Sequence, residues 1–271
     1  MNQLVSTEWL NKNLNKVKIL DASWHLPNLD RDAFEEYKLN HITNSNFFDI
    51  DKNSNQNTSL SHMLPLKKDW ENIVSNLGIN NSDHVIIYDN SDVFSSCRVW
   101  YTFLYFGHSP DLVSVLDGNF KKWIDEKNST SKEIKQINRS SYTANEVSQL
   151  VLNKDQIKKN IINKKFQLID ARGEQRFLGL QPEARKELIS GNVKGSKNLP
   201  FQELINKENG TFKNRKELIV IFKKKEILID KEIAFTCGSG VTACILGLAN
   251  SIISGKKPVI YDGSWAEYGL E

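Results

Sequence analysis

The chain has 271 residues, of which 39% are hydrophobic and 25% are charged. This balance is typical of a globular protein with a buried core and excludes a disordered chain. The 36 basic and 33 acidic side chains leave a formal net charge of +3. So small an excess does not favour nucleic acid or a membrane surface as a partner.

The first ten residues, MNQLVSTEWL, lack the basic and apolar segments of a secretory signal. No apolar run reaches the ~18 residues that a membrane helix needs. The three cysteines, Cys97, Cys237 and Cys244, are an odd number at irregular spacing. We therefore expect a cytoplasmic protein with free thiols and no metal site.

Three patterns occur twice in the chain, in the same order and at a nearly constant offset. KILDAS matches QLIDAR, HVIIYDNSD matches EIAFTCGSG, and VSVLDGNFKKW matches KPVIYDGSWAEY. These repeats predict a duplicated domain. The segment 125–145 between the copies is polar and without apolar periodicity, which is typical of a linker. We predict a first domain over 1–128, a linker over 129–147 and a second domain over 148–271.

Each copy alternates short apolar runs with helical patterns. In chain order, the predicted strands and helices are strands 18–22 and 84–88, a helix over 95–107, strand 112–116, strands 167–171 and 232–236, a helix over 241–254 and strand 258–262. Strand–helix–strand alternation indicates parallel strands covered by helices on both faces. The predicted fold class is α/β, twice.

Cys237 stands between a predicted strand and a predicted helix, in a loop that we expect to expose it. Gly238 and Gly240 free the backbone of this loop to curl. Such a loop at a helix N-terminus aims several N–H groups at one point and stabilises a thiolate, which is the nucleophilic form of cysteine. The alternative is a tight turn with an inert cysteine. Cys244 lies on an apolar helical stripe and Cys97 sits early in the matching helix, so both are interpreted as core residues.

Two other anion-binding loops do not fit. A phosphate-binding P-loop ends in Gly-Lys-Ser/Thr, whereas Gly240 is followed by Val241 and Thr242. Cysteine phosphatases have an arginine six positions after the cysteine, which is Ala243 here. A tetrahedral dianion would therefore lack its bidentate partner.

The strand followed by CGSGVTAC, in the second of two α/β copies, resembles the rhodanese superfamily over nearly the whole chain, from Leu4 to the YDGSWAEYG segment. The resemblance implies two tandem rhodanese-like domains, each a parallel sheet flanked by helices. The Gly238-Ser239 pair is similar to the branch that uses 3-mercaptopyruvate, because thiosulfate-using members generally carry basic residues there. The loop residues Gly238, Gly240, Val241 and Thr242 are then expected to bind substrate.

The resemblance implies an activity and a set of site residues. Sulfur would pass from 3-mercaptopyruvate through a Cys237 persulfide to thioredoxin, a small thiol or cyanide, without a cofactor. Arg176 and Arg185 match the family's substrate-binding arginines, whereas Arg172 is interpreted as an ion pair with Asp170. A thiosulfate:cyanide sulfurtransferase and a non-catalytic sulfur carrier are the alternatives.

The family also implies a proton relay of Ser239, His62 and Asp51, because its Asp and His lie eleven residues apart in this segment, as they do here. The first copy has Asp89 where Cys237 stands, so it cannot form a persulfide. One further departure concerns a turn. The family's Gly-His-Ile-Pro-Gly turn is Gly-Asn-Val-Lys-Gly at 191–195 and Asn-His-Ile-Thr-Asn at 40–44.

Overall fold

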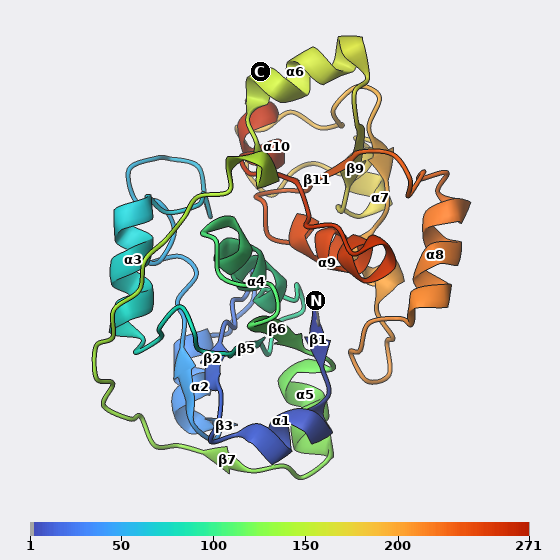
Figure 1. Cartoon of the computed structure of the whole chain (residues 1–271). Helices are drawn as coiled ribbons and strands as arrows, with labels where there is room; N and C mark the ends of the chain where they lie inside the picture. The colour runs from blue at the N-terminus through green and yellow to red at the C-terminus, as the bar shows by residue number, and fades with distance from the viewer. Residues whose placement is uncertain (1–2, 271) are drawn as a thin grey trace. The chain divides into compact units, whose positions relative to one another are not determined.

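The computed structural model describes residues 3–270 (Figure 1). The chain divides into two compact units, and each unit includes one short segment from the other half of the sequence. The first unit holds the described residues up to Gln56, then Leu64–Val147 and Lys207–Thr211. The second unit holds Asn57–Met63, Ser148–Asn206 and the described residues from Phe212 onward. The predicted boundaries at 128 and 148 did not anticipate these exchanges and stay a prediction.

A five-stranded parallel sheet forms the centre of the first unit, in the order β1-β6-β5-β2-β4. Its strands are β1 (Leu4–Val5), β2 (Lys18–Asp21), β4 (Ser45–Phe47), β5 (Val85–Tyr88) and β6 (Val113–Leu116). Its helices are α1 (Thr7–Asn13), α2 (Ala33–Leu39), α3 (Lys67–Asn76), α4 (Ser96–Tyr105) and α5 (Asn119–Asp125). All four residues of β5 and of β6 are buried, as expected for parallel strands with helices on both faces.

The second unit repeats this arrangement with a parallel sheet in the order β10-β9-β11-β12-β8. Its strands are β8 (Val151–Leu152), β9 (Gln167–Asp170), β10 (Lys197–Asn198), β11 (Ile233–Thr236) and β12 (Ile260–Tyr261). Its helices are α6 (Lys154–Asn163), α7 (Glu174–Phe177), α8 (Arg215–Lys224), α9 (Ala243–Ser254) and α10 (Ser264–Tyr268), with 3-10 turns η1 (Ser148–Leu150) and η2 (Phe201–Leu204). The two strand orders correspond one to one, which confirms the duplication predicted from the repeats.

Local sequence explains where several helices begin. Asp32 and Ser6 cap α2 and α1 with their side-chain oxygens, whereas Asn153 and Asn214 open α6 and α8 with complete capping boxes. The predicted central strands are confirmed, each one to three residues shorter than expected. Within the described residues, every helix is too short or too polar to cross a bilayer.

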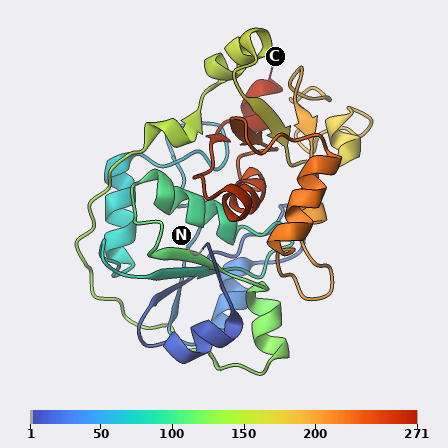
Figure 2. The ribbon, with the colours of Figure 1, turned by 45° about the vertical axis from the view of Figure 1, so that its right-hand side comes forward.

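The predicted amphipathic helix over 241–254 is wrong in its exposure. The helix α9 begins at Ala243, and ten of its twelve residues are buried. It packs against β11 and β12 of the sheet and also against α8 and η2, and Figure 2 shows α8 and α9 side by side. Because a second layer covers the helix, its apolar residues extend all round it. Cys244 is fully buried, and so is Cys97 in α4, which confirms both as core residues.

The polar segment predicted as a linker is held against the first unit. Its residues Thr130–Ser131 form β7, which pairs antiparallel with β3 (His41–Ile42). Further along, the Ser140 backbone N–H donates to the Ser75 carbonyl oxygen at 2.9 Å, and Tyr142 is buried with its hydroxyl 3.2 Å from His108 Nδ1. Backbone pairing and one buried ring therefore fix a segment that has no apolar periodicity.

The loop after β5 corresponds to the cysteine loop after β11. The Phe120 backbone N–H donates to the Asp89 carbonyl at 3.0 Å, as that of Trp265 donates to the Cys237 carbonyl at 3.0 Å. Within this loop the backbone N–H groups of Ser91 and Ser96 donate to the two Asp89 carboxylate oxygens, at 2.9 and 2.8 Å. The Asp89 side chain is fully buried, and burial raises its pKa to about 6 despite these bonds.

This raised pKa predicts a pH-dependent stability. The folded chain keeps the Asp89 proton in a range, about pH 4 to 6, in which the unfolded chain has lost it, so the free energy of unfolding falls as the pH rises. Relative to the Asp89→Asn variant, the wild type should lose about 2 kcal/mol between pH 4.5 and pH 7. Urea denaturation of both proteins at the two pH values measures this difference. A stability difference independent of pH would show that Asp89 does not titrate in this range.

Candidate active site

Cys237 directly follows the last residue of β11, and its exposed fraction is only 2%. The expectation that the loop exposes this cysteine is therefore wrong. The segment that begins α10 closes over the loop, because the N–H groups of Trp265 and Ala266 donate to the carbonyls of Cys237 and Gly238, at 3.0 and 2.8 Å. These bonds fix the start of the loop while burying the cysteine.

Ser264 fixes the same end of the loop through its hydroxyl. The Ser264 Oγ accepts from the Cys237 N–H at 3.2 Å and donates to the Tyr261 carbonyl at 2.8 Å. Ser264 has a φ of 47°, in the left-handed region that few residues other than glycine adopt. This strained backbone conformation occurs where the Ser264 hydroxyl links the end of β12 to the cysteine loop.

The far end of the loop turns into α9 at Gly240, whose φ is 78°. A side chain at this position would be strained, so the glycine is required by the turn. The Cys244 thiol, on the second residue of α9, donates to the Gly240 carbonyl oxygen at 3.2 Å. Cys244 thus contacts the loop backbone from the core side. Val241 is buried and Thr242 is half-buried, directly before the first turn of α9.

Segment 57–63, which belongs to the second unit, brings His62 to the loop. The His62 Nδ1 lies 2.8 Å from the Ser239 Oγ, and the imidazole is buried. His62 also has a positive φ of 62°. A strained, buried histidine beside a hydroxyl is an arrangement that occurs at functional sites.

The neighbouring residue, Ser61, contacts one of the predicted arginines. The Arg185 Nη2 donates to the Ser61 Oγ at 2.9 Å. Among residues 3–270, Arg185 has no carboxylate partner, so its positive charge is not neutralised within the chain. Consecutive residues of one segment therefore connect the half-buried Arg185 to Ser239 of the cysteine loop.

Arg176 lies against the other side of the loop. A Cβ added to Gly238 would lie 3.4 Å from the Arg176 Nη2. The Nη2 and Nε of Arg176 donate to the Glu183 carboxylate, at 2.5 and 3.4 Å. Its Nη1 has no hydrogen-bond partner in the described chain, which leaves one edge of a one-third exposed guanidinium open to a ligand.

Glu183 joins Arg176 to a buried ion network at the end of β9. Arg172 donates to both oxygens of Asp170 and, through Nη1 at 2.7 Å, to Glu183. The three side chains are 1–2% exposed. Burial alone would lower the pKa of Arg172, but its bonds to the two carboxylates raise it. The predicted Arg172–Asp170 ion pair is confirmed.

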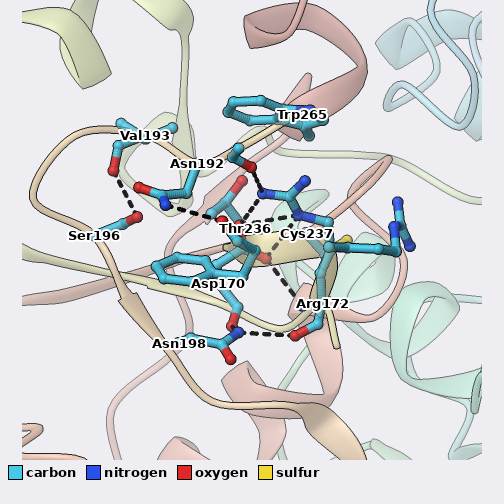
Figure 3. Close-up of polar contacts among 12 residues, drawn as sticks. Asp170, Arg172, Asn192, Val193, Ser196, Asn198, Thr236, Cys237 and Trp265 are labelled. Atoms are coloured by element: carbon cyan, nitrogen blue, oxygen red, sulfur yellow. Dashed lines mark hydrogen bonds and ion pairs between the residues drawn. The ribbon is translucent and has the colours of Figure 1, made fainter. Parts of the chain in front are cut away.

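Figure 3 shows the ring of Trp265 above the Arg172 guanidinium, whose carbon lies 4.5 Å from the ring centroid. This is a buried cation–π contact. Because the Trp265 N–H holds the Cys237 carbonyl, the ion network is connected to the cysteine loop through one residue. On its other edge the network reaches the Gly191 carbonyl, to which the Arg172 Nη2 donates at 2.9 Å.

The second unit thus gathers Cys237, Ser239, His62, Arg176 and Arg185, five of the residues singled out from the sequence. Asp51 belongs to the first unit, where its carboxylate accepts from the Trp24 indole N–H at 2.8 Å. Its pairing with His62 stays a prediction.

Sequence reasoning missed Ser61, Glu183, Ser264 and Trp265. Glu183 had one sequence signal, as an acidic residue between Arg176 and Arg185 in an arginine-rich segment. Trp265 had another, since it lies in one of the repeated patterns. Nothing in the sequence indicates that Ser61 contacts an arginine 124 positions away.

A model of the rhodanese-like domain matches residues 6–126 and 153–271. The chain belongs to the rhodanese family. This family member is 38% identical to the 3-mercaptopyruvate sulfurtransferase of Mus musculus, over 98% of this chain and 91% of the relative. It is also 38% identical to the thiosulfate/3-mercaptopyruvate sulfurtransferase 1, mitochondrial, of Arabidopsis thaliana, over 99% of this chain and 76% of the relative.

Among solved structures, the rhodanese-family chain matches that of SseA from Escherichia coli, whose description concerns 3-mercaptopyruvate sulfotransferases. The TM-score is 0.88 at 30% identity, and the match covers 98% of this chain and 99% of SseA. The predicted resemblance and the predicted fold, two rhodanese-like domains each with a parallel sheet flanked by helices, are confirmed.

Proposed function

We propose that this protein is a sulfurtransferase that takes sulfur from 3-mercaptopyruvate onto Cys237. The Cys237 thiolate attacks the substrate sulfur, and the carbon–sulfur bond breaks with its electron pair going to carbon. The enolate of pyruvate forms, takes up a proton and leaves as pyruvate. The outer sulfur of the persulfide then passes to an acceptor thiolate or to cyanide, which regenerates the Cys237 thiolate.

The observation that carries this proposal is the pair of arginines beside a neutral cysteine loop. Arg176 keeps one guanidinium edge open next to Gly238, and Arg185 has no carboxylate partner within residues 3–270. Guanidinium groups bind a carboxylate in a bidentate way, and 3-mercaptopyruvate has a carboxylate two carbons from its sulfur-bearing carbon. The Gly238-Ser239 pair is neutral, so it offers no positive charge to the terminal sulfonate of thiosulfate, the alternative sulfur donor.

The duplicated loop supports an anion at position 237. In the first unit the side chain at the matching position is the Asp89 carboxylate, and loop N–H groups of Ser91 and Ser96 donate to it. A thiolate or persulfide on Cys237 would need the same kind of stabilisation from the loop before α9. The residues Gly238, Gly240, Val241 and Thr242 would provide this backbone surface.

The proton for the enolate is proposed to come through Ser239 and His62. Their side chains are in hydrogen-bond contact, so a proton can move between hydroxyl and imidazole without rearrangement. Asp51 would select the His62 tautomer, as a carboxylate does in a serine-protease relay. No cofactor is needed for these steps.

Small thiols, thioredoxin and cyanide are the proposed acceptors, and a reducing compartment such as the cytoplasm is the proposed location. None of the three cysteines forms a disulfide within residues 3–270, which fits a compartment in which thiols stay reduced. A second donor, thiosulfate, is favoured by the relative named for both donors. The proposed preference for 3-mercaptopyruvate over thiosulfate is therefore argued from Arg176 and Arg185.

We predict that Cys237 is the only cysteine required for turnover. Cys237→Ser should abolish pyruvate release and the +32 Da adduct expected in intact mass spectra after 3-mercaptopyruvate is added, because only the loop thiol can hold the outer sulfur. Cys97→Ser is the matched control and should keep both signals. Pyruvate release by the Cys237→Ser variant would end the proposal.

For the arginines, Arg176→Ala and Arg185→Ala should each weaken recognition of the substrate carboxylate by about 1.5–3 kcal/mol. The measurement is kcat/KM with 3-mercaptopyruvate, set beside persulfide formation from thiosulfate, which has no carboxylate. Arg139→Ala, an exposed arginine of the first unit, is the control and should change neither value. Equal losses with both donors would show that the arginines act on the loop and not on the carboxylate.

The relay predicts a separation between chemistry and thiol reactivity. His62→Ala should slow pyruvate formation by roughly 10²–10⁴, the scale of positioned acid–base help. Alkylation of Cys237 by iodoacetamide should stay within a few-fold of wild type, since the loop backbone acts independently of His62. Asp51→Asn should also lose activity, and adding it to His62→Ala should cost little more.

The matched control for the relay is His84→Ala, which removes a half-buried histidine of the first unit. Circular dichroism must first show that all variants are folded. Wild-type turnover by folded His62→Ala would refute the relay while leaving the persulfide proposal in place.

A further inference from the structure

The second unit contains a cavity of about 470 Å³ that none of the proposed catalytic residues lines. Its volume is within the range of cavities that hold small organic ligands. It is lined by one face of α6, residues 164–166, the start of β9, the turn 193–197 and residues 228–232.

The cavity lies at the opposite end of the sheet from Cys237. Gln167 and Glu232 line it, at the beginning of β9 and just before β11, whereas Cys237 follows the end of β11. Four residues of strand separate the two ends, which is about 13 Å at the usual rise per residue. A ligand in this cavity would therefore not occupy the cysteine loop.

The lining concentrates the positive charge of the protein. Five lysines and one glutamate give it a formal charge of +4, whereas the whole chain carries +3, so the rest of the chain sums to −1. The lysines are Lys164, Lys165, Lys194, Lys197 and Lys231. The single acid, Glu232, is 3.8 Å from Lys256, which is outside the lining.

None of the five lysines is paired with a carboxylate in the part of the chain that the structure describes, residues 3–270. Lys197 instead donates to the Glu226 carbonyl oxygen. Gathering like charges without counter-charges is unfavourable unless an anion joins them. Lys194 adds one of these charges. It is the fourth residue of the turn 191–195, where the family's Gly-His-Ile-Pro-Gly turn has proline.

The lining also contains apolar side chains, and hydrogen bonds between side chains and backbone fix its walls. Ile157, Leu168 and Val193 are buried members of the core, and Ile161 and Phe166 pack against them. The Asn160 amide both donates to and accepts from the Phe166 backbone, at 2.9 and 3.0 Å. The Gln167 amide does the same with Leu228, at 2.8 and 3.0 Å. These paired bonds hold the cavity in shape before a ligand arrives.

We propose that this cavity is a binding site for a small organic polyanion with an apolar body. The apolar part would lie on the surface of Phe166 and its neighbours, and the negative groups would meet the five lysines of the lining. The inference does not depend on the proposed chemistry at Cys237, and the two can fail separately.

Fluorescence anisotropy of pyrene-1,3,6,8-tetrasulfonate, an aromatic tetraanion, tests the site on the full chain. We expect one probe per chain, with binding that weakens as salt is raised. Lys165→Gln combined with Lys194→Gln should weaken binding about tenfold, because two charge pairings are lost. Leu228→Gln should weaken binding of the probe about threefold, because it removes an apolar contact of the lining. Leu228 is 53% exposed.

The matched control is Lys223→Gln with Lys224→Gln, the same change of charge on exposed lysines of α8 outside the cavity. It should change binding less than twofold. An equal loss in both double variants would show general attraction to a basic chain and overturn the site. Displacement of the probe by 3-mercaptopyruvate would place it at the cysteine loop instead, and equally strong competition by inorganic triphosphate would remove the apolar requirement.

Discussion

The arrangement of the site in the second unit depends on one buried arginine. Arg172 neutralises Asp170 and shares Glu183 with Arg176, so two carboxylates and two guanidinium groups form a network without net charge. Such a network is costly to desolvate, and its members stay charged only because each has its partner. Buried ion networks often add little net stability compared with apolar packing. The value of this network is positional, because Glu183 orients Arg176 and the Trp265 ring covers Arg172 while the Trp265 backbone holds Cys237.

The two copies of the domain show how one loop serves two purposes. After β5 the loop amides bind a carboxylate that is part of the chain, so above about pH 6 Asp89 itself fills the anion position. After β11 the same position has Cys237, on which the proposed reaction would place first a thiolate and then a persulfide. The first loop therefore carries its own carboxylate, whereas in the proposed reaction the second loop would bind different anions in turn.

Many of the strands and the turn of the cysteine loop could be predicted, because the residues within each of these segments determine its structure. The strands after Lys18, Val85, Gln167 and Ile233 are apolar runs next to turn residues, and the CGSGVTAC motif specifies its own turn and helix start. The burial of Cys237 was not predictable, because it depends on backbone bonds from Trp265 and Ala266, in which side-chain identity plays no part. The contacts of Ser61 with Arg185 and of His62 with Ser239 were equally hidden, since segment 57–63 is polar, irregular and far away in sequence.

The direction of the parallel strands explains why reactive and basic residues separate in the second unit. Loops at the carboxyl ends of β9 and β11 lead into Arg172 and Cys237, at the edge where α/β sheets usually bind their ligands. The amino ends of the same strands are bounded by α6 and the 193–197 turn, whose lysines are unrelated to the cysteine. Lys194 adds a positive charge to the cavity, while Gly191, three residues earlier in the same turn, accepts a hydrogen bond from Arg172. The sheet thus lets one domain carry two chemically distinct surfaces, at opposite ends of the same strands.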